Sequence, residues 1–236
     1  VKLTLDQIIF DGSKFEYILY TTANTVNISN CKFINNTADN NILRFMNGVQ
    51  ELTLNNVELR DNTATSSSVS DSGTIYINSS FLTNVTFENV NAINNVSKGN
   101  GGVVFFGSSC ENADISFIDC ELFGNVAEKV GGGICAYEAK SILISNTQIT
   151  GNTANGNCNT SGSLQTGQKT GAAGGLHVTG TEAKITIENS KIFKNISTIA
   201  ANEYCADICL VGTTKTTSKK KPSSFVQATL IMDDSS

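Results

Sequence analysis

Several residue types that enzymes and nucleic-acid-binding proteins rely on are scarce in this 236-residue chain. It has no tryptophan, one proline, one histidine and only two arginines. The 16 basic and 21 acidic residues give a formal net charge of −5. Phosphate backbones require a clustered basic surface, so no nucleic-acid partner is expected.

Long hydrophobic runs are also missing. No stretch of 18 consecutive apolar residues occurs, which predicts that no helix spans a membrane. The chain starts at Val1 without a basic and then apolar leader, so any secretion signal is expected to have been removed or to lie outside this sequence.

Asparagine and glycine are abundant instead, with 28 and 20 residues. This composition favours a fold with many tight turns over a helical one. Seven Asn-X-Ser/Thr acceptor sites for N-glycosylation occur, at Asn27, Asn35, Asn78, Asn84, Asn95, Asn159 and Asn195. Together they favour an extracellular or cell-surface protein, although a chain rich in Asn, Ser and Thr also generates such sites by chance.

A short pattern recurs through the chain. Its anchor positions are Gln7, Asn30, Asn56, Asn89, Asp119, Asn146, Asn189 and Asp234. The residues two and four positions before each of the first seven anchors are apolar. The residues one and three positions before these anchors are polar, except for Ile118 and Leu143. This alternation predicts a strand with one buried face in each repeat. A second column follows six residues after the anchors, at Asn36, Asn62, Asn95, Asn125, Asn152 and Asn195.

A third short strand in each repeat often starts with glycine, as in Gly73-Thr74-Ile75 and Gly133-Ile134-Cys135. Strands of this kind bury their apolar residues only when successive repeats stack. The sequence therefore predicts an all-β fold, a right-handed parallel β-helix of about seven coils, in one domain over residues 1–236. Variable loops are expected at residues 155–172 and 213–225.

The second asparagine column is predicted to be structural. Asparagine tolerates the left-handed backbone conformation, and its amide can form hydrogen bonds along the stack. We therefore expect one Asn per coil both to make the turn and to satisfy buried backbone groups. Because a sugar on Asn95 or Asn195 would break this ladder, glycans are expected only on Asn27, Asn35, Asn78, Asn84 and Asn159.

Two motifs resemble a known family. Phe33-Ile34-Asn35-Asn36 and Gly131-Gly132-Gly133-Ile134 are similar to the FxxN and GGA[ILV] repeats of chlamydial polymorphic outer-membrane proteins. Relaxed copies extend from about Val26 to Leu210, and similar repeats occur in surface proteins of protists. The resemblance implies a β-helical surface module that acts in adhesion.

The seven cysteines include no CxxC motif. Cys31 and Cys120 share a column with aliphatic residues, which predicts buried free thiols. Cys158 and Cys205 lie on loops of adjacent coils and are the disulfide candidate. His177 falls between Cys135 and Cys209 in one strand column, but two coils separate the cysteines, so we expect no metal there and exposed or loosely packed side chains.

An enzyme is the competing class, because β-helices also host polysaccharide lyases and glycoside hydrolases. Such sites need grouped carboxylates with a base, or paired carboxylates. The pair Arg60 and Asp61 is better explained as an exposed salt bridge. No catalytic residue, cofactor or metal is predicted.

Ice binding by an outward row of Thr4, Thr53, Thr86 and Thr186 is a weaker alternative, because Leu143 interrupts the row.

The sequence thus predicts a non-enzymatic structural or adhesive module, with a glycan or a protein on a cell surface as its ligand. Both ends of the chain read as ordinary coil strands, at residues 1–5 and 228–232. An uncapped solenoid exposes apolar cross-sections and strand edges. Either the chain is part of a longer solenoid, or copies stack head to tail into filaments.

Overall fold

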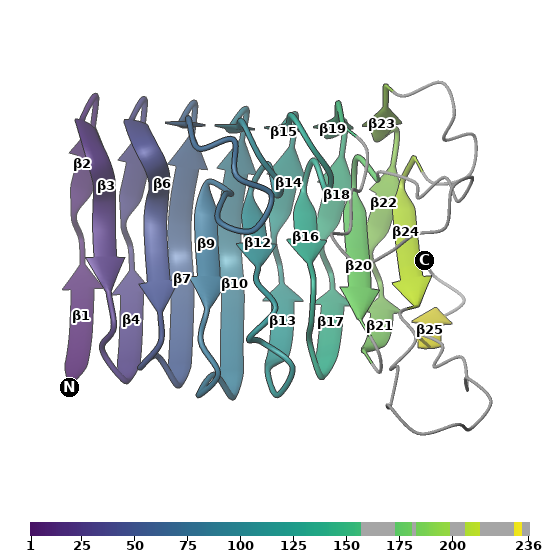
Figure 1. Ribbon diagram of the computed structural model, residues 1–236, viewed down its shortest axis with the longest axis horizontal. Coiled ribbons are helices and arrows are strands. Elements are labelled where there is room, and N and C mark those ends of the chain that lie inside the picture. The colour runs from purple at the N-terminus through teal and green to yellow at the C-terminus, as the bar shows by residue number, and fades with distance from the viewer. Residues whose placement is uncertain (157–172, 181–182, 199–205, 213–228, 233–236) are drawn as a thin grey trace.

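The computed structural model is a parallel β-helix, and it describes residues 1–156, 173–180, 183–198, 206–212 and 229–232. Figure 1 shows the coils stacked side by side into a rod, with the first coil at one end. Seven coils are followed by the first strand of an eighth. The predicted fold class and the approximate number of coils are therefore confirmed.

The first sheet is built from the strands before and after each anchor. Its main path runs through β1 (Lys2–Asp6), β4 (Thr25–Ser29), β7 (Glu51–Arg60), β10 (Asn84–Ile93), β13 (Asp114–Ile118), β17 (Ser141–Ser145), β21 (Lys184–Glu188) and β25 (Thr229–Met232). Paired with these are β2 (Ile9–Asp11), β5 (Lys32–Ile34), β14 (Glu121–Phe123), β18 (Gln148–Thr150) and β22 (Lys191–Phe193). All pairings are parallel, and equivalent repeat positions face each other.

The second sheet holds the remaining strands. They are β3 (Lys14–Thr21), β6 (Thr37–Met46), β8 (Thr63–Ala64), β9 (Ile75–Asn78), β11 (Val96–Ser97), β12 (Val104–Phe106), β15 (Val126–Ala127), β16 (Ile134–Ala136), β19 (Thr153–Ala154), β20 (Leu176–Gly180), β23 (Ile196–Ser197) and β24 (Ile208–Gly212).

The core is formed by the apolar columns that the repeat predicts. Val26, Leu52, Val85 and Ile115 stack in adjacent coils and are at most 1% exposed. The rings of Phe87 and Phe117 stack face to face, with 4.6 Å between their centroids. Burial of stacked side chains between coils is the main stabilisation of a solenoid.

The turn and the ladder belong to different residues, which corrects the prediction that one Asn does both. The anchors adopt positive φ, as at Asn30 (53°) and Asn89 (51°). A second left-handed position precedes each ladder asparagine, for example Asp61 at 55° before Asn62. The ladder asparagines are not among the residues with positive φ, and they are at most 5% exposed.

The buried asparagines form a continuous hydrogen-bonded ladder. In each coil the Nδ2 donates to a backbone carbonyl of the preceding coil and to the Oδ1 of the next asparagine, as Asn62 does to Phe33 (2.8 Å) and Asn95 (2.8 Å). The ladder runs from the amide of Ser13 to the carboxylate of Asp207, which accepts from Asn195 at 2.8 Å. Every rung thereby satisfies buried polar groups.

A second apolar layer covers the outer face of the second sheet. It contains Tyr76, Phe105, Val130, Cys135 and Ala154, all at most 3% exposed. The loops before the third strands pack closely against each other here. A Cβ on Gly102 would lie 1.9 Å from the carbonyl oxygen of Gly132, so this position requires glycine.

Candidate functional site

A polar groove runs along the coils, between two rows of outward side chains. The turn row consists of Asn30, Asn56, Asn89, Asp119 and Asn146, and the strand row of Lys32, Glu58, Asn91, Glu121 and Gln148. The groove has two segments, with volumes of about 250 and 380 Å³, and both are lined by Asn89 and Asn91. The larger volume is within the range of small-ligand sites.

The repeat explains why the groove forms. The left-handed anchor turns its side chain outward, the next residue points into the core, and the one after it points outward again. Cys31, Val57, Val90 and Cys120 therefore form the floor and are at most 3% exposed. The predicted burial of Cys31 and Cys120 is confirmed. Burial raises the pKa of Cys120 to about 11, so this thiol is not a nucleophile at neutral pH.

Hydrogen bonds between coils fix the turn row. The Nδ2 of Asn56 donates to Asn30 (2.7 Å), and that of Asn89 donates to Asn56 (3.1 Å). Asn146 donates in the same way to the carboxylate of Asp119. Asn30, Asn56 and Asn89 are thus joined in one group, and Asp119 and Asn146 in another, and order of this kind before a ligand binds lowers the entropic cost of binding.

The charges differ along the groove. Lys32 and Arg60 both pair with Glu58 at 2.9 Å, and their hydrogen bonds hold the pKa of Glu58 below its usual range. Arg60 also contacts Asp61 at 3.3 Å, which confirms the predicted exposed pair. Asp119 and Glu121 form no ion pair within the described chain, so the larger segment is acidic.

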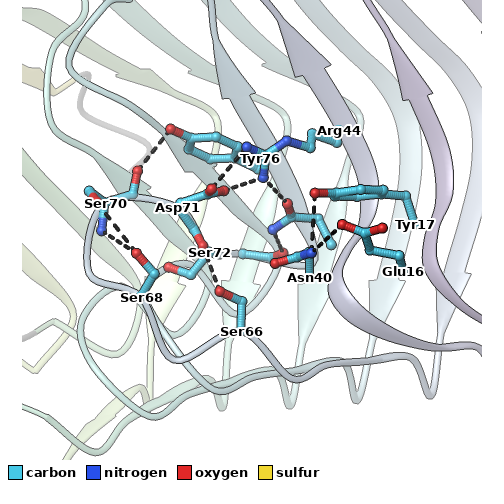
Figure 2. A network of polar contacts seen from close by, with 12 residues as sticks. Glu16, Tyr17, Asn40, Arg44, Ser66, Ser68, Ser70, Asp71, Ser72 and Tyr76 are labelled. Carbon is cyan, nitrogen blue, oxygen red and sulfur yellow. Dashed lines mark hydrogen bonds and ion pairs between the residues drawn. The ribbon is translucent and has the colours of Figure 1, made fainter.

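The main polar centre that the repeat did not predict surrounds Arg44 on β6 (Figure 2). Its guanidinium lies between the rings of Tyr17 and Tyr76, 5.3 and 4.9 Å from their centroids. It donates to both carboxylate oxygens of Asp71 and to Asn41. Burial disfavours the charge on Arg44, but Asp71 outweighs this effect and raises the arginine pKa.

This centre fastens a loop to the sheet. The hydroxyl of Tyr76 donates to the carbonyl of Ser70, and Ser66 donates to the carbonyl of Asp71, both at 2.8 Å. Figure 2 shows both contacts on the loop side of the pair formed by Arg44 and Asp71. Asp71 fills the carboxylate-binding fork of Arg44, so the centre is a structural clamp rather than an open site.

The column of Cys135, His177 and Cys209 is buried, which corrects the expectation of exposed or loosely packed side chains. All three are at most 3% exposed, and His177 neighbours one cysteine in each adjacent coil. The second apolar layer accounts for this burial. Burial also lowers the pKa of His177 to about 4, and neither of its ring nitrogens has a hydrogen-bond partner. Within the described ranges no three His, Cys, Asp or Glu residues are grouped to hold a metal ion.

The glycosylation candidates occupy different surroundings. Asn35 and Asn84 are exposed, and Asn27 is half-buried on the outward face of β4. Asn78 was expected on a loop but is the last residue of β9, and its Oδ1 accepts from the amide of Ser109 at 3.0 Å. Asn159, the disulfide candidates Cys158 and Cys205, and the loop of residues 213–225 lie outside the described residues, as does most of the loop of residues 155–172.

The threonine row expected on the outward face of the first sheet is interrupted by other residues. Asn27 lies between Thr4 and Thr53, and Leu143 lies beside Thr186. The threonines therefore do not form a continuous row on this face.

The chain matches no family model, no curated protein and no solved structure. No helix that could cross a membrane occurs in the part of the chain that the structure describes.

Proposed function

We propose that this chain is a non-enzymatic structural or adhesive module of the extracellular space or cell surface, and that it binds a glycan along the polar groove. The observation that carries the proposal is the groove itself, with ordered amide and carboxylate side chains in successive coils. Such side chains form hydrogen bonds with hydroxyl groups. A rod that repeats one polar surface suits a polymer that repeats one sugar unit.

A glycan-active enzyme remains the second candidate, favoured by one observation. Asp119 and Glu121 both line the larger segment, and glycoside hydrolases use a pair of carboxylates. However, both side chains are exposed, and Asp119 already accepts a hydrogen bond from Asn146. A general acid is usually held in an apolar pocket that raises its pKa. The exposure of both carboxylates therefore favours binding over turnover.

The two candidates separate in one experiment. The protein is incubated with acidic and neutral polysaccharides, with and without calcium, while binding is followed by biolayer interferometry and products by reducing ends and ultraviolet absorbance. We expect saturable binding without products. New reducing ends or unsaturated sugars that disappear in Asp119→Asn or Glu121→Gln would establish the enzyme instead.

Self-association is a further part of the proposal. Ile9 and Phe15 on the first described coil are 63% and 67% exposed, and contact with a second copy, or with a further coil of a longer solenoid, would cover them. Light scattering and electron microscopy of the isolated chain should show linear polymers. A monomer that persists at high concentration would rule out stacking.

A further inference from the structure

Nine outward side chains form a regular patch in the larger segment of the groove and beside it. They come from three successive coils, and each coil supplies one turn residue and two strand residues in parallel register. The patch consists of Asn89, Asn91, Ile93, Asp119, Glu121, Phe123, Asn146, Gln148 and Thr150. Two of its rows are polar, and the third is mostly apolar.

Phe123 gives the patch an aromatic platform. Its side chain is 46% exposed, although phenylalanine is usually buried. In the next coil Gly151 lies beside the ring at a φ of +66°, and a Cβ there would be 3.3 Å from Cε2 of Phe123. Because Gly151 has no side chain, the ring remains open between Ile93 and Thr150, its neighbours in register.

The patch carries negative charge only. Asp119 and Glu121 occupy its centre, and none of the nine residues is lysine or arginine. Of the basic residues next along the groove, Lys32 and Arg60 are both engaged by Glu58, whereas Lys191 lies beside Gln148 in the following coil, at the end of the patch. An acidic group at the centre of this patch would therefore meet the like charges of Asp119 and Glu121.

From this arrangement we infer that the patch binds a linear glycan that carries no acidic groups. The inference rests on the proposed function and adds the ligand class. A sugar ring has an apolar C–H face that can pack on Phe123, and its hydroxyls can reach the carboxylates and amides of the two polar rows. Uronic and sulfated sugars are disfavoured by the like charges of Asp119 and Glu121. The repeat of the patch along the rod favours a chain of sugars over a single one.

The test is titration calorimetry of the full chain with a neutral β-linked hexasaccharide and with an oligogalacturonate of the same length. We expect the neutral ligand to bind at least tenfold more tightly. Phe123→Ala should weaken its binding at least tenfold, whereas Phe81→Ala, an exposed phenylalanine on the turn before β10, should leave it unchanged. Glu121→Gln should strengthen oligogalacturonate binding severalfold, and Glu111→Gln, an exposed glutamate on a turn, should not.

Two results would overturn the inference while leaving the proposed function intact. One is wild-type binding of the oligogalacturonate at equal or higher affinity. The other is equal loss of neutral binding in Phe123→Ala and Phe81→Ala. If neither oligosaccharide binds and no polysaccharide of the panel does, both the inference and the proposed function fail. Circular dichroism and thermal melting of each variant check that the fold is retained.

Discussion

Asn125 illustrates how single side chains hold this fold together. Its Nδ2 donates to the carbonyl of Ala92 and to the Oδ1 of Asn152, both at 2.9 Å. Its Oδ1 accepts from the backbone amide and the side chain of Asn95, also at 2.9 Å. One buried amide therefore joins three coils, and no other side chain of its size supplies two donors and two acceptors in this geometry.

Replacing Asn125 with alanine should lower the free energy of unfolding by about 3 kcal/mol. The substitution removes the side-chain partner of the Ala92 carbonyl and of the Asn95 backbone amide, while Asn152 keeps only the backbone amide of residue 125, and each buried group left without a partner costs about 1–3 kcal/mol. The control is Asn91→Ala, an exposed asparagine on the groove, which should cost less than about 0.5 kcal/mol. Urea denaturation measures both. Equal effects would mean that the ladder does not stabilise the fold.

His177 should make stability depend on pH. Burial lowers its pKa from 6.5 to about 4, so between these values the unfolded chain binds a proton that the folded chain does not. Stability is therefore complete above about pH 6.5 and is lost as the pH falls towards 4, by up to roughly 3 kcal/mol.

His177→Leu removes this titration and replaces the imidazole with an apolar side chain of similar size. The wild type should lose more stability than the variant when urea melts are compared from pH 7 to pH 4. The contributions of the carboxylates to stability cancel in the comparison, because these groups titrate in both proteins. Parallel pH profiles would show that His177 is not buried in its neutral form.

At the level of elements, the loops before the third strands turn an outward sheet face into a second apolar layer. The Arg44 clamp fixes one of these loops, through Asp71 on the loop and Tyr17 and Tyr76 on neighbouring strands. The clamp lies at the surface of the layer, since the side chain of Asp71 is 39% exposed. A few polar contacts thus hold the loop over the buried aromatic side chains of the second apolar layer.

Asp71→Asn should release this loop. The variant leaves a buried guanidinium without its counter-ion, and we expect a loss of about 2 kcal/mol and faster proteolysis between Thr65 and Ser72. In the control, Asp61→Asn, an exposed pair is removed, and it should cost less than about 1 kcal/mol. Unchanged cleavage of the loop would show that other contacts hold it.

The elements themselves could largely be predicted from sequence, whereas their outer cover could not. Alternating apolar positions mark the strands of the core, because an inward side chain must be apolar in every coil. Nothing equivalent marks Arg44 or His177, since a polar residue on an outward column is read as exposed. Their burial depends on how the loops fold back over the sheet, and loop sequences carry no period.

The groove is an intermediate case. The groove residues occur at fixed offsets from each anchor of the repeat, and Asp119 and Glu121 are two of them. Their meeting in one groove depends on the left-handed turn at the anchor, which sets the angle between the two rows. The asparagine found at most anchors is the sequence signal for this left-handed turn, and it could have revealed the groove.

At the scale of the whole molecule, the rod presents several long faces, and N-glycans would mark the faces open to solvent. We predict glycans at Asn27, Asn35 and Asn84, together with Asn78 and Asn159. None is expected at Asn95 or Asn195, which are 0% and 5% exposed and bonded in the ladder. Glycopeptide mass spectrometry of the secreted chain measures each occupancy. Full occupancy at either ladder site would be incompatible with this arrangement.

The central claim, that the polar groove binds a glycan, can be tested most directly by nuclear magnetic resonance. Side-chain amides give separate resonances, and the groove and the ladder provide two sets in the same molecule. On addition of a neutral hexasaccharide, the side-chain amide signals of Asn89, Asn91 and Gln148 should shift in a saturable manner, while those of the buried Asn62 and Asn125 should not. Shifts confined to another face of the rod, or no shift with any glycan tested, would contradict the claim.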